Sequence, residues 1–202
     1  MHDEIEEMVD VIFDLAGATP PASYPYTLWS EILRLVPLLE NRQAGILPLR
    51  LPDHVHGGRL HKRAKLVLRS PTMLADEITA SLSDQQLLVD GVSLTLGRGK
   101  TKSLLPYPTL HAQTVAGAED EIRFMQDIEQ QMKVLGINGK PICGKAHALS
   151  NHSHTIRGYS LVIHDLKAEA SLRLQYAGLG GARQYGFGLF IPYKLISGLD
   201  GE

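Results

Sequence analysis

The first half of the chain alternates between the hydrophobic pattern of a strand and that of a helix. Residues 8–17 are apolar, rich in β-branched side chains and end at a glycine, which predicts a strand. Residues 27–41 repeat aliphatic side chains at helical spacing, which predicts a helix, and Pro37 is placed to kink its end. The stripe consists of Leu28, Ile32, Leu35 and Leu39. Beyond it the pattern predicts a loop over 42–59, a strand over 64–70, a helix over 72–83 and two short strands within 86–97 around an Asp90-Gly91 turn.

The second half also alternates between predicted strands and helices. Residues 119–136 give the clearest helix, since acidic residues open it and Gly136 closes it. Its expected stripe consists of Ile122, Met125, Ile128, Met132 and Leu135. Around it we expect a strand over 109–117, a hairpin of 139–150 with 155–166, a helix over 167–177 and a last strand over 187–194. We interpret both halves as having the order β-α-β-β-α-β. This predicts an α+β fold of two tandem ferredoxin-like domains, at residues 1–104 and 105–202.

Composition indicates a soluble protein of the cytoplasm. Cys143 is the single cysteine among 202 residues, so no internal disulfide can form, which fits a reducing compartment. The acidic start of the chain is unlike a signal or transit peptide. No apolar run approaches the roughly 20 residues that span a bilayer. We therefore expect no membrane association.

Positive charge is gathered in two short stretches, although the formal net charge is −2. The first stretch, residues 59–69, carries Arg59, Lys62, Arg63, Lys65 and Arg69 with no acidic residue among them. The second consists of Arg98, Lys100 and Lys102. The net charge argues against indiscriminate nucleic-acid binding, but a near-neutral protein can still carry a local basic groove. A solvated strand face beside the acidic N-terminus is the plainer alternative, and composition leaves both open.

Residues 178–188 hold five glycines directly before the last expected strand. A helix C-cap followed by a turn accounts for Gly178 but leaves the other four unexplained. A dinucleotide-binding loop follows a strand and opens a helix, the reverse of the order here. The Gly99-Lys100-Thr101 run lacks the earlier glycine of a phosphate-binding loop, because position 94 is Leu. What remains is a surface where another backbone approaches closely, with Arg183 able to pair with a phosphate.

The glycines also form a recognisable motif. Gly178-Leu179-Gly180 and Gly186-Phe187-Gly188 flank a five-residue spacer that contains Arg183. Placed between the last helix and last strand of a second ferredoxin-like domain, this motif resembles the CRISPR-associated RAMP superfamily. Within it, the segments 64–71, 110–115 and 171–192 are similar to a compact branch of the pre-crRNA-processing endoribonucleases, the Cas six family.

The resemblance implies metal-independent cleavage of a CRISPR repeat RNA. The ribose 2′-OH attacks the adjacent phosphate, leaving a 2′,3′-cyclic phosphate and a 5′-OH. Histidine suits the proton transfers and a cation suits the phosphorane charge. The family's helix-start histidine is replaced here by Tyr24 and Tyr26, so the expected catalytic residues come from the basic loop. They are His56 with Lys62 first, then His54 and His61, with assistance from Tyr24 or Tyr26.

The same resemblance assigns a wider set of residues to RNA binding. They are Gly178, Gly180, Gly181, Arg183, Gly186, Gly188, Arg59, Arg63, Lys65, Arg69, Arg98, Lys100, Lys102 and Arg157. His111 is expected to be partly buried in its strand. His152 and His154 lack partners at metal-ligand spacing, so neither a metal nor another cofactor is predicted.

Three functions remain open on the sequence. The first is the endoribonuclease, holding the stem-loop of the repeat and staying with its product among other CRISPR effector subunits. The second is a non-catalytic crRNA-binding subunit of such a complex. The third is a ferredoxin-like protein with no RNA role, in which the glycines serve packing.

Overall fold

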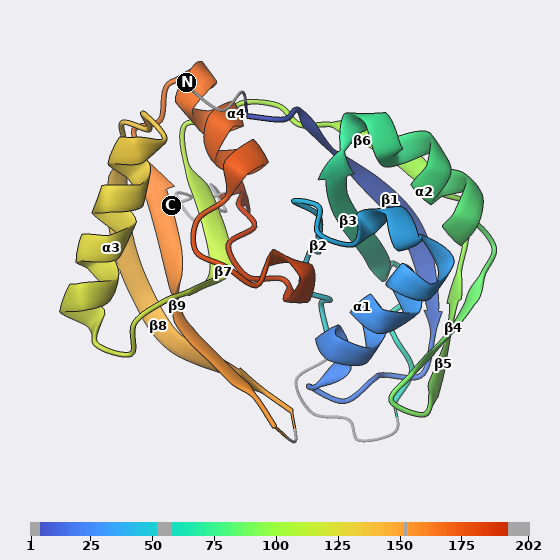
Figure 1. The fold of residues 1–202 in the computed structure, drawn as a ribbon. Helices are drawn as coiled ribbons and strands as arrows, with labels where there is room; N and C mark the ends of the chain where they lie inside the picture. Colours follow the sequence, from blue (N-terminus) through green and yellow to red (C-terminus); the bar gives the residue numbers. More distant parts are fainter. Residues whose placement is uncertain (1–4, 52–57, 152, 194–202) are drawn as a thin grey trace, which may run out of the picture.

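The computed structural model describes residues 5–51, 58–151 and 153–193. It forms two units side by side, each an antiparallel sheet with two α-helices packed on it (Figure 1). The strand orders below confirm the expected α+β fold of tandem ferredoxin-like units. The division at residues 104 and 105 stays a prediction.

The first sheet is centred on β1 (Met8–Gly17). β1 pairs with β3 (Lys65–Pro71) on one side and with β6 (Lys100–Ser103) on the other, while β2 (Gly45–Ile46) extends the sheet beyond β3. The resulting β2-β3-β1-β6 order is that of a ferredoxin-like unit. A hairpin of β4 (Gln86–Val89) and β5 (Val92–Leu96) is added at the far end of β1.

Alternation along β1 explains why the helices lie on one face of this sheet. Val11 and Phe13 are fully buried together with residues of α1 (Tyr24–Leu35) and α2 (Ala75–Leu82), such as Ile32 and Ile78. Intervening positions such as Asp10 point to the opposite face. At Asp10 this opposite face is covered by the second unit, because Arg69, which pairs with Asp10, donates to the Phe190 carbonyl.

The second sheet has the order β10-β7-β9-β8, again that of a ferredoxin-like unit. Its strands are β7 (Leu110–Ala116), β8 (Lys140–Ser150), β9 (Thr155–His164) and β10 (Ile191–Pro192). Its helices are α3 (Glu121–Val134) and α4 (Ala168–Ala177). Phe124, Ile128 and Leu174 of these helices pack with Leu161 and Ile163 of β9 in a second, separate core.

Several expected boundaries differ from the observed ones. The first helix begins three residues earlier, at Tyr24, and ends before Pro37, which opens a short 3-10 helix. The loop predicted over 42–59 contains β2, and the basic stretch at 100–103 forms β6. In α3 the stripe includes Phe124 rather than Ile122, which is 72% exposed.

The last strand is the largest difference. A strand was expected over 187–194, but β10 comprises only Ile191 and Pro192, and residue 194 lies outside the described residues. Phe187 and Phe190 are nevertheless buried. The apolar run is therefore explained by core packing of an irregular segment rather than by strand pairing.

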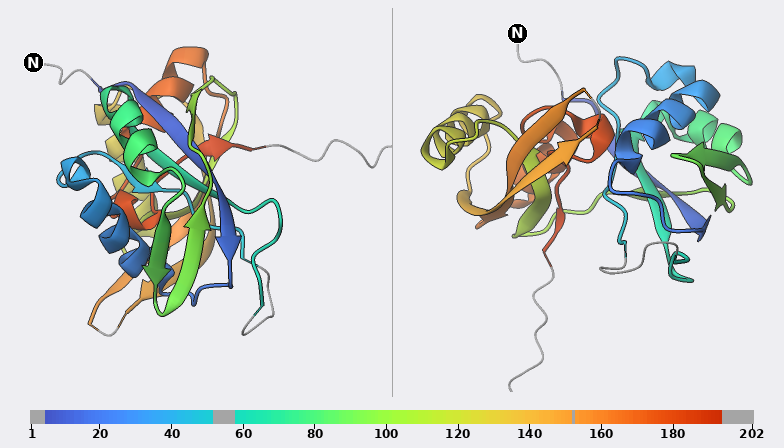
Figure 2. Two further views of the ribbon diagram at one scale, coloured as in Figure 1. Left: turned by 90° about the vertical axis from the view of Figure 1, so that its right-hand side faces the viewer. Right: turned by 90° about the horizontal axis from the view of Figure 1, so that it is seen from below.

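The two units contact each other through several elements and are joined by the segment between β6 and β7 (Figure 2). The segment between α4 and β10 reaches into the first unit, where its 3-10 helix (Arg183–Tyr185) lies against β2 and α1. The glycine motif therefore lies where the two units meet. No helix within the described residues is long and apolar enough to cross a membrane.

Candidate functional site

Three of the five motif glycines are packed inside the protein. Gly178 ends α4 with φ +65°, and Gly188 has φ +66° and donates its N–H to the Thr114 carbonyl at 2.8 Å. A Cβ on Gly188 would overlap the Leu179 carbonyl. Gly186, also at positive φ, packs against Pro48 and the Ile46 carbonyl. These three glycines are thus required by close backbone packing, which revises the expectation that they meet RNA.

The other two glycines are exposed, although Gly180 has φ +69° and a Cβ on it would meet the Ala116 carbonyl at 2.5 Å. Gly180 donates its N–H to the Gln131 side-chain oxygen at 2.8 Å. A Cβ on Gly181 would meet nothing within 4 Å, so its backbone faces open space. The exposed peptide between them is the part of the motif that another molecule can approach.

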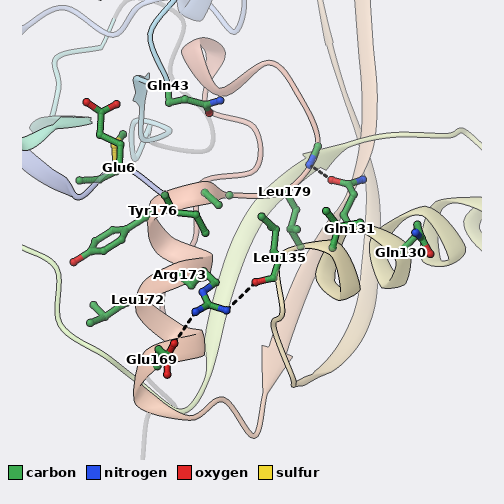
Figure 3. A pocket seen from close by; sticks show the side chains of 16 residues that line it. Glu6, Gln43, Gln130, Gln131, Leu135, Glu169, Leu172, Arg173, Tyr176 and Leu179 are labelled. Atoms are coloured by element: carbon green, nitrogen blue, oxygen red, sulfur yellow. Dashed lines mark hydrogen bonds and ion pairs between the residues drawn. The ribbon is translucent and has the colours of Figure 1, made fainter. Parts of the chain in front are cut away.

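A cavity lies on each side of this exposed peptide. The larger, about 1280 Å³, is a groove between α3, α4 and the start of β1. Figure 3 shows Arg173 in it, paired with Glu169 at 2.6 Å and donating to the Leu135 carbonyl at 3.1 Å. The smaller cavity, about 460 Å³, is lined by Trp29, Arg42 and Arg183 among others.

The sequence suggested an exposed Arg183 side chain, but in the structure this side chain is buried. The side chain is 7% exposed, and its Nη1 donates to the Tyr176 carbonyl at 2.8 Å, at the end of α4. Its Nε and Nη2 have no hydrogen-bond partner among the described residues. Burial, and to a lesser extent the charge of Arg69, lowers the Arg183 pKa to about 10. These two donors are unpaired and buried beside the smaller cavity, so they can donate hydrogen bonds to an anion.

Arg69 was expected on an RNA-binding face, and the structure corrects this. It is 1% exposed, and Nε and Nη2 donate to the two carboxylate oxygens of Asp10 at 2.8 and 3.1 Å. Nη1 donates to the Phe190 carbonyl at 2.6 Å. A guanidinium with all these contacts joins the first sheet to the segment before β10, and its burial leaves no surface for RNA.

The rest of the basic residues stay at the surface. Lys100 and Lys102 lie on β6, and neither forms an ion pair within the part of the chain that the structure describes. Lys65 pairs with Asp14. The backbone of Arg59 forms an isolated antiparallel β-bridge with Ala18. The exposed remainder of the basic set consists of Lys62, Arg63 and Arg98.

The residues expected to be catalytic are only partly described. His54 and His56 lie outside the described residues. His61 and Lys62 are exposed, and the His61 Nδ1 accepts the Arg63 N–H at 3.1 Å. Leu60, which precedes them in the chain, is buried in the core of the first unit. The described part of this loop therefore presents a histidine and a lysine to solvent.

The two tyrosines at the start of α1 differ in environment. Tyr24 is buried, its hydroxyl accepts the Leu49 N–H at 2.8 Å, and burial raises its pKa to about 12. This bond holds the chain at Leu49, and the expected catalytic role of Tyr24 stays a prediction. Tyr26 is partly exposed, and its hydroxyl donates to the Leu149 carbonyl at 3.3 Å, on the β8–β9 hairpin.

No local sequence pattern indicated the second-unit residues that contact Tyr26. The Tyr185 ring lies 4.6 Å from the Tyr26 ring, between centroids, and burial raises the Tyr26 pKa. Arg157, expected at RNA, is exposed and lies 3.5 Å from Glu119. These contacts join residues far apart in sequence, so local patterns could not reveal them.

Comparison with known proteins decides the family. The family model described as "Cas6 Crispr" matches residues 9–195 of this chain. The chain belongs to the Cas6 family. It is also 30% identical, over 187 residues, to the CRISPR-associated endonuclease Cas6 of Myxococcus xanthus (strain DK1622). That match covers 91% of this chain and 81% of the relative.

Solved structures of other proteins share this fold. A Cas6-related protein from Pyrococcus furiosus superposes with a TM-score of 0.64 at 16% identity, covering 95% of this chain and 99% of that one. An RAMP protein described as binding different RNA substrates gives 0.60 at 17% identity, covering 90% and 98%. The Cse3 endoribonuclease bound to a 19-nucleotide RNA gives 0.55 at 13%, covering 92% and 98%. At these identities the likeness concerns the fold.

Proposed function

We propose that this chain is an endoribonuclease that cleaves CRISPR repeat RNA without a metal ion. The observation that carries the proposal is its membership of the Cas6 family over residues 9–195, together with 30% identity to a relative named as an endonuclease. Two structurally similar proteins are described with RNA. The exposed cations of β6 and of the 59–65 segment supply the positive surface that RNA binding requires.

The chemistry needs three groups, and the segment 54–65 contains candidates for each. A histidine, His56 by first preference, removes the 2′-OH proton, and the oxygen then attacks the adjacent phosphorus. The bond from phosphorus to the 5′-oxygen breaks, and a second group returns a proton to that oxygen. Lys62 stabilises the charge that develops on the phosphate oxygens. His54 and His61 are the alternatives for the two proton transfers.

RNA is held by the exposed peptide of Gly180 and Gly181 and by surface cations. The two unpaired donors of Arg183 lie beside the same peptide and suit a phosphate. Lys100 and Lys102 extend the positive surface along β6. We further propose that the product stays bound and joins other effector subunits, so that cleavage stops after one turnover.

A second function is favoured by one observation. The first turn of α1 contains no histidine or carboxylate, and burial raises the pKa of its two tyrosines further above neutral, that of Tyr24 to about 12. A family member without a helix-start histidine can serve as a non-catalytic crRNA-binding subunit. The alternatives differ in whether the repeat RNA is cut.

The test is a cleavage assay on the repeat RNA of the chain's own CRISPR array, in the presence of EDTA. A matched RNA carries a single 2′-deoxy sugar before the scissile phosphate. We expect the first RNA to give a 2′,3′-cyclic phosphate end and the second to remain intact. Tight binding without cleavage of either RNA supports the second function, and cleavage of the deoxy RNA overturns the mechanism.

A further inference from the structure

Two polar side chains of α4 are buried on a face of the helix that points away from the larger cavity. Ser171 is 0% exposed and Gln175 is 1% exposed. They are four residues apart and share one face of α4, and the Gln175 Nε2 donates to the Ser171 hydroxyl at 3.5 Å. Leu172, Arg173 and Tyr176 line the groove from another face of the helix (Figure 3). Buried polar groups need hydrogen-bond partners, so the partners of this pair show what the buried face of α4 holds.

These partners lie in the segment between β6 and β7. We call residues 104–109 the connecting segment, because it joins the first unit to the second. The Gln175 Nε2 donates to the Leu105 carbonyl at 2.9 Å, and the Ser171 hydroxyl accepts the Tyr107 N–H at 2.9 Å. A proline follows each of these two segment residues, and a residue before proline favours an extended backbone. The last strand of the first unit is therefore joined to α4 by a stiff segment that is held at two points.

The backbone of Gln175 also contacts the first sheet. Its carbonyl accepts a hydrogen bond from Arg69 Nη1 at 3.4 Å, and the same nitrogen donates to the Phe190 carbonyl at 2.6 Å. Arg69 lies on β3 and is paired with Asp10 of β1. Gln175 thus contacts two separate parts of the chain that belong to the first unit or lead to it, the connecting segment through its side chain and β3 through its carbonyl.

The relative placement of the two units depends on contacts of this kind. No described residue belongs to both hydrophobic cores, and units without a shared core move relative to each other unless other contacts hold them. The candidates for RNA contact lie on both units, with Lys100 and Lys102 on the first and Gly181 on the second. An RNA that meets both groups is placed correctly for cleavage only while the units keep one arrangement. A displacement of about 1 Å far from the chemistry can lower a rate about a hundredfold.

We propose that Gln175 and Ser171 are positioning residues, whose bonds to the connecting segment hold the two units in the arrangement in which bound RNA is cleaved. Their side chains are buried, so they do not contact the RNA and act only through the connecting segment. The consequence for cleavage rests on the proposed function. The arrangement of the units does not, because it can be measured without RNA.

The arrangement is measured by pulsed electron paramagnetic resonance on a chain with two spin labels. The labels are attached through Met73→Cys in the first unit and Ile122→Cys in the second, at positions 74% and 72% exposed, with Cys143→Ser removing the native thiol. We expect Gln175→Met to broaden the distribution of distances between the labels. The substituted side chain keeps a similar length but cannot donate to the Leu105 carbonyl. A distribution identical to that of the parent chain would overturn the proposal.

A second variant and a control accompany this measurement. Ser171→Ala removes a single oxygen, the acceptor of the Tyr107 N–H, and should broaden the distribution in the same way, also where Gln175→Met does not fold. Ile128→Val is the control, because it removes a methyl group from the core of the second unit and lowers stability without touching the connecting segment. It should leave the distribution unchanged. Equal broadening in the control would trace the effect to lost stability and would overturn the positioning role.

Cleavage is measured on the same substitutions in the unlabelled chain. The readout is the single-turnover rate at saturating repeat RNA, below the unfolding temperature of every variant, so that neither affinity nor unfolding limits it. We expect Gln175→Met and Ser171→Ala to lower this rate at least about tenfold, while Ile128→Val leaves it unchanged. A broadened distribution with a normal rate would overturn the role in cleavage. If the wild type cleaves no repeat RNA, the proposed function fails, whereas the distance distributions still decide whether the two residues hold the units.

Discussion

Arg69 and Asp10 form a buried ion pair through two parallel hydrogen bonds, from Nε at 2.8 Å and from Nη2 at 3.1 Å. The pair lies between neighbouring strands of the first sheet, while the third contact of Arg69 reaches the Phe190 carbonyl of the second unit. A charge that is 1% exposed needs such partners, because burying it unpaired is costly. The pair therefore fixes the segment between the glycine motif and β10 against the first sheet.

We expect Arg69→Ala to destabilise the protein by about 3–5 kcal/mol, because the carboxylate of Asp10 is left without its partner. The free energy of unfolding is measured by urea denaturation. Lys65→Ala is the control, since Lys65 and Asp14 form an ion pair in which both side chains are largely exposed. It should cost about 0–1 kcal/mol. Equal effects of the two substitutions would show that the buried pair contributes no more to the free energy of unfolding than the exposed pair does.

The motif glycines separate into a packing group and an exposed group, which predicts opposite outcomes for two substitutions. Gly188→Ala places a Cβ against the Leu179 carbonyl at a positive φ, so it should lower the stability by several kcal/mol. Gly181→Ala meets open space and should leave stability within about 0.5 kcal/mol. Thermal unfolding measures both variants.

RNA binding distinguishes the two glycines further. If RNA crosses the exposed peptide, Gly181→Ala weakens RNA affinity while the fold stays intact. An unchanged affinity would remove Gly181 from the binding surface.

Tyr24 offers a test of a structural role against a catalytic one. Tyr24→Phe removes the acceptor of the buried Leu49 N–H, which should cost about 1–3 kcal/mol of stability. The raised Tyr24 pKa means that the folded state holds this proton more tightly than the unfolded state. The wild type therefore loses stability as the pH rises from about 10, the ordinary tyrosine pKa, toward about 12, and the variant loses less. The RNA cleavage rate per folded molecule should not change; a large loss would return Tyr24 to the catalytic group.

The catalytic assignment is tested at His56. We expect His56→Ala to lower the single-turnover cleavage rate at least about a hundredfold while RNA affinity stays nearly intact, because proton transfer is lost but phosphate contacts remain. His147→Ala is the control, since His147 is an exposed histidine of the β8–β9 hairpin outside the proposed machinery. Normal cleavage by the His56 variant would move the role to His54 or His61.

Most of the helices and strands, and the family, could be predicted from the residues alone. Helical and strand periods follow from which side chains a local segment must bury, so α3 and the central strands β1, β7 and β9 could be placed from residues 8–17, 109–117, 119–136 and 155–166 alone. The short strand β2 could not be placed in this way, because two residues are too few to show a hydrophobic period. The glycine motif pointed to the family because its spacing is local in the chain.

Which basic and aromatic residues lie at the surface depends on contacts between distant parts of the chain. Arg69 and Lys65 look alike in sequence, yet one is 1% exposed and the other is at the surface. The difference arises because Arg69 meets Asp10 and Phe190, 59 and 121 residues away. His111 and Tyr193 meet in the same way, across β7 and the end of β10. Such contacts depend on how the two sheets are brought together, and no local pattern of side chains encodes that arrangement.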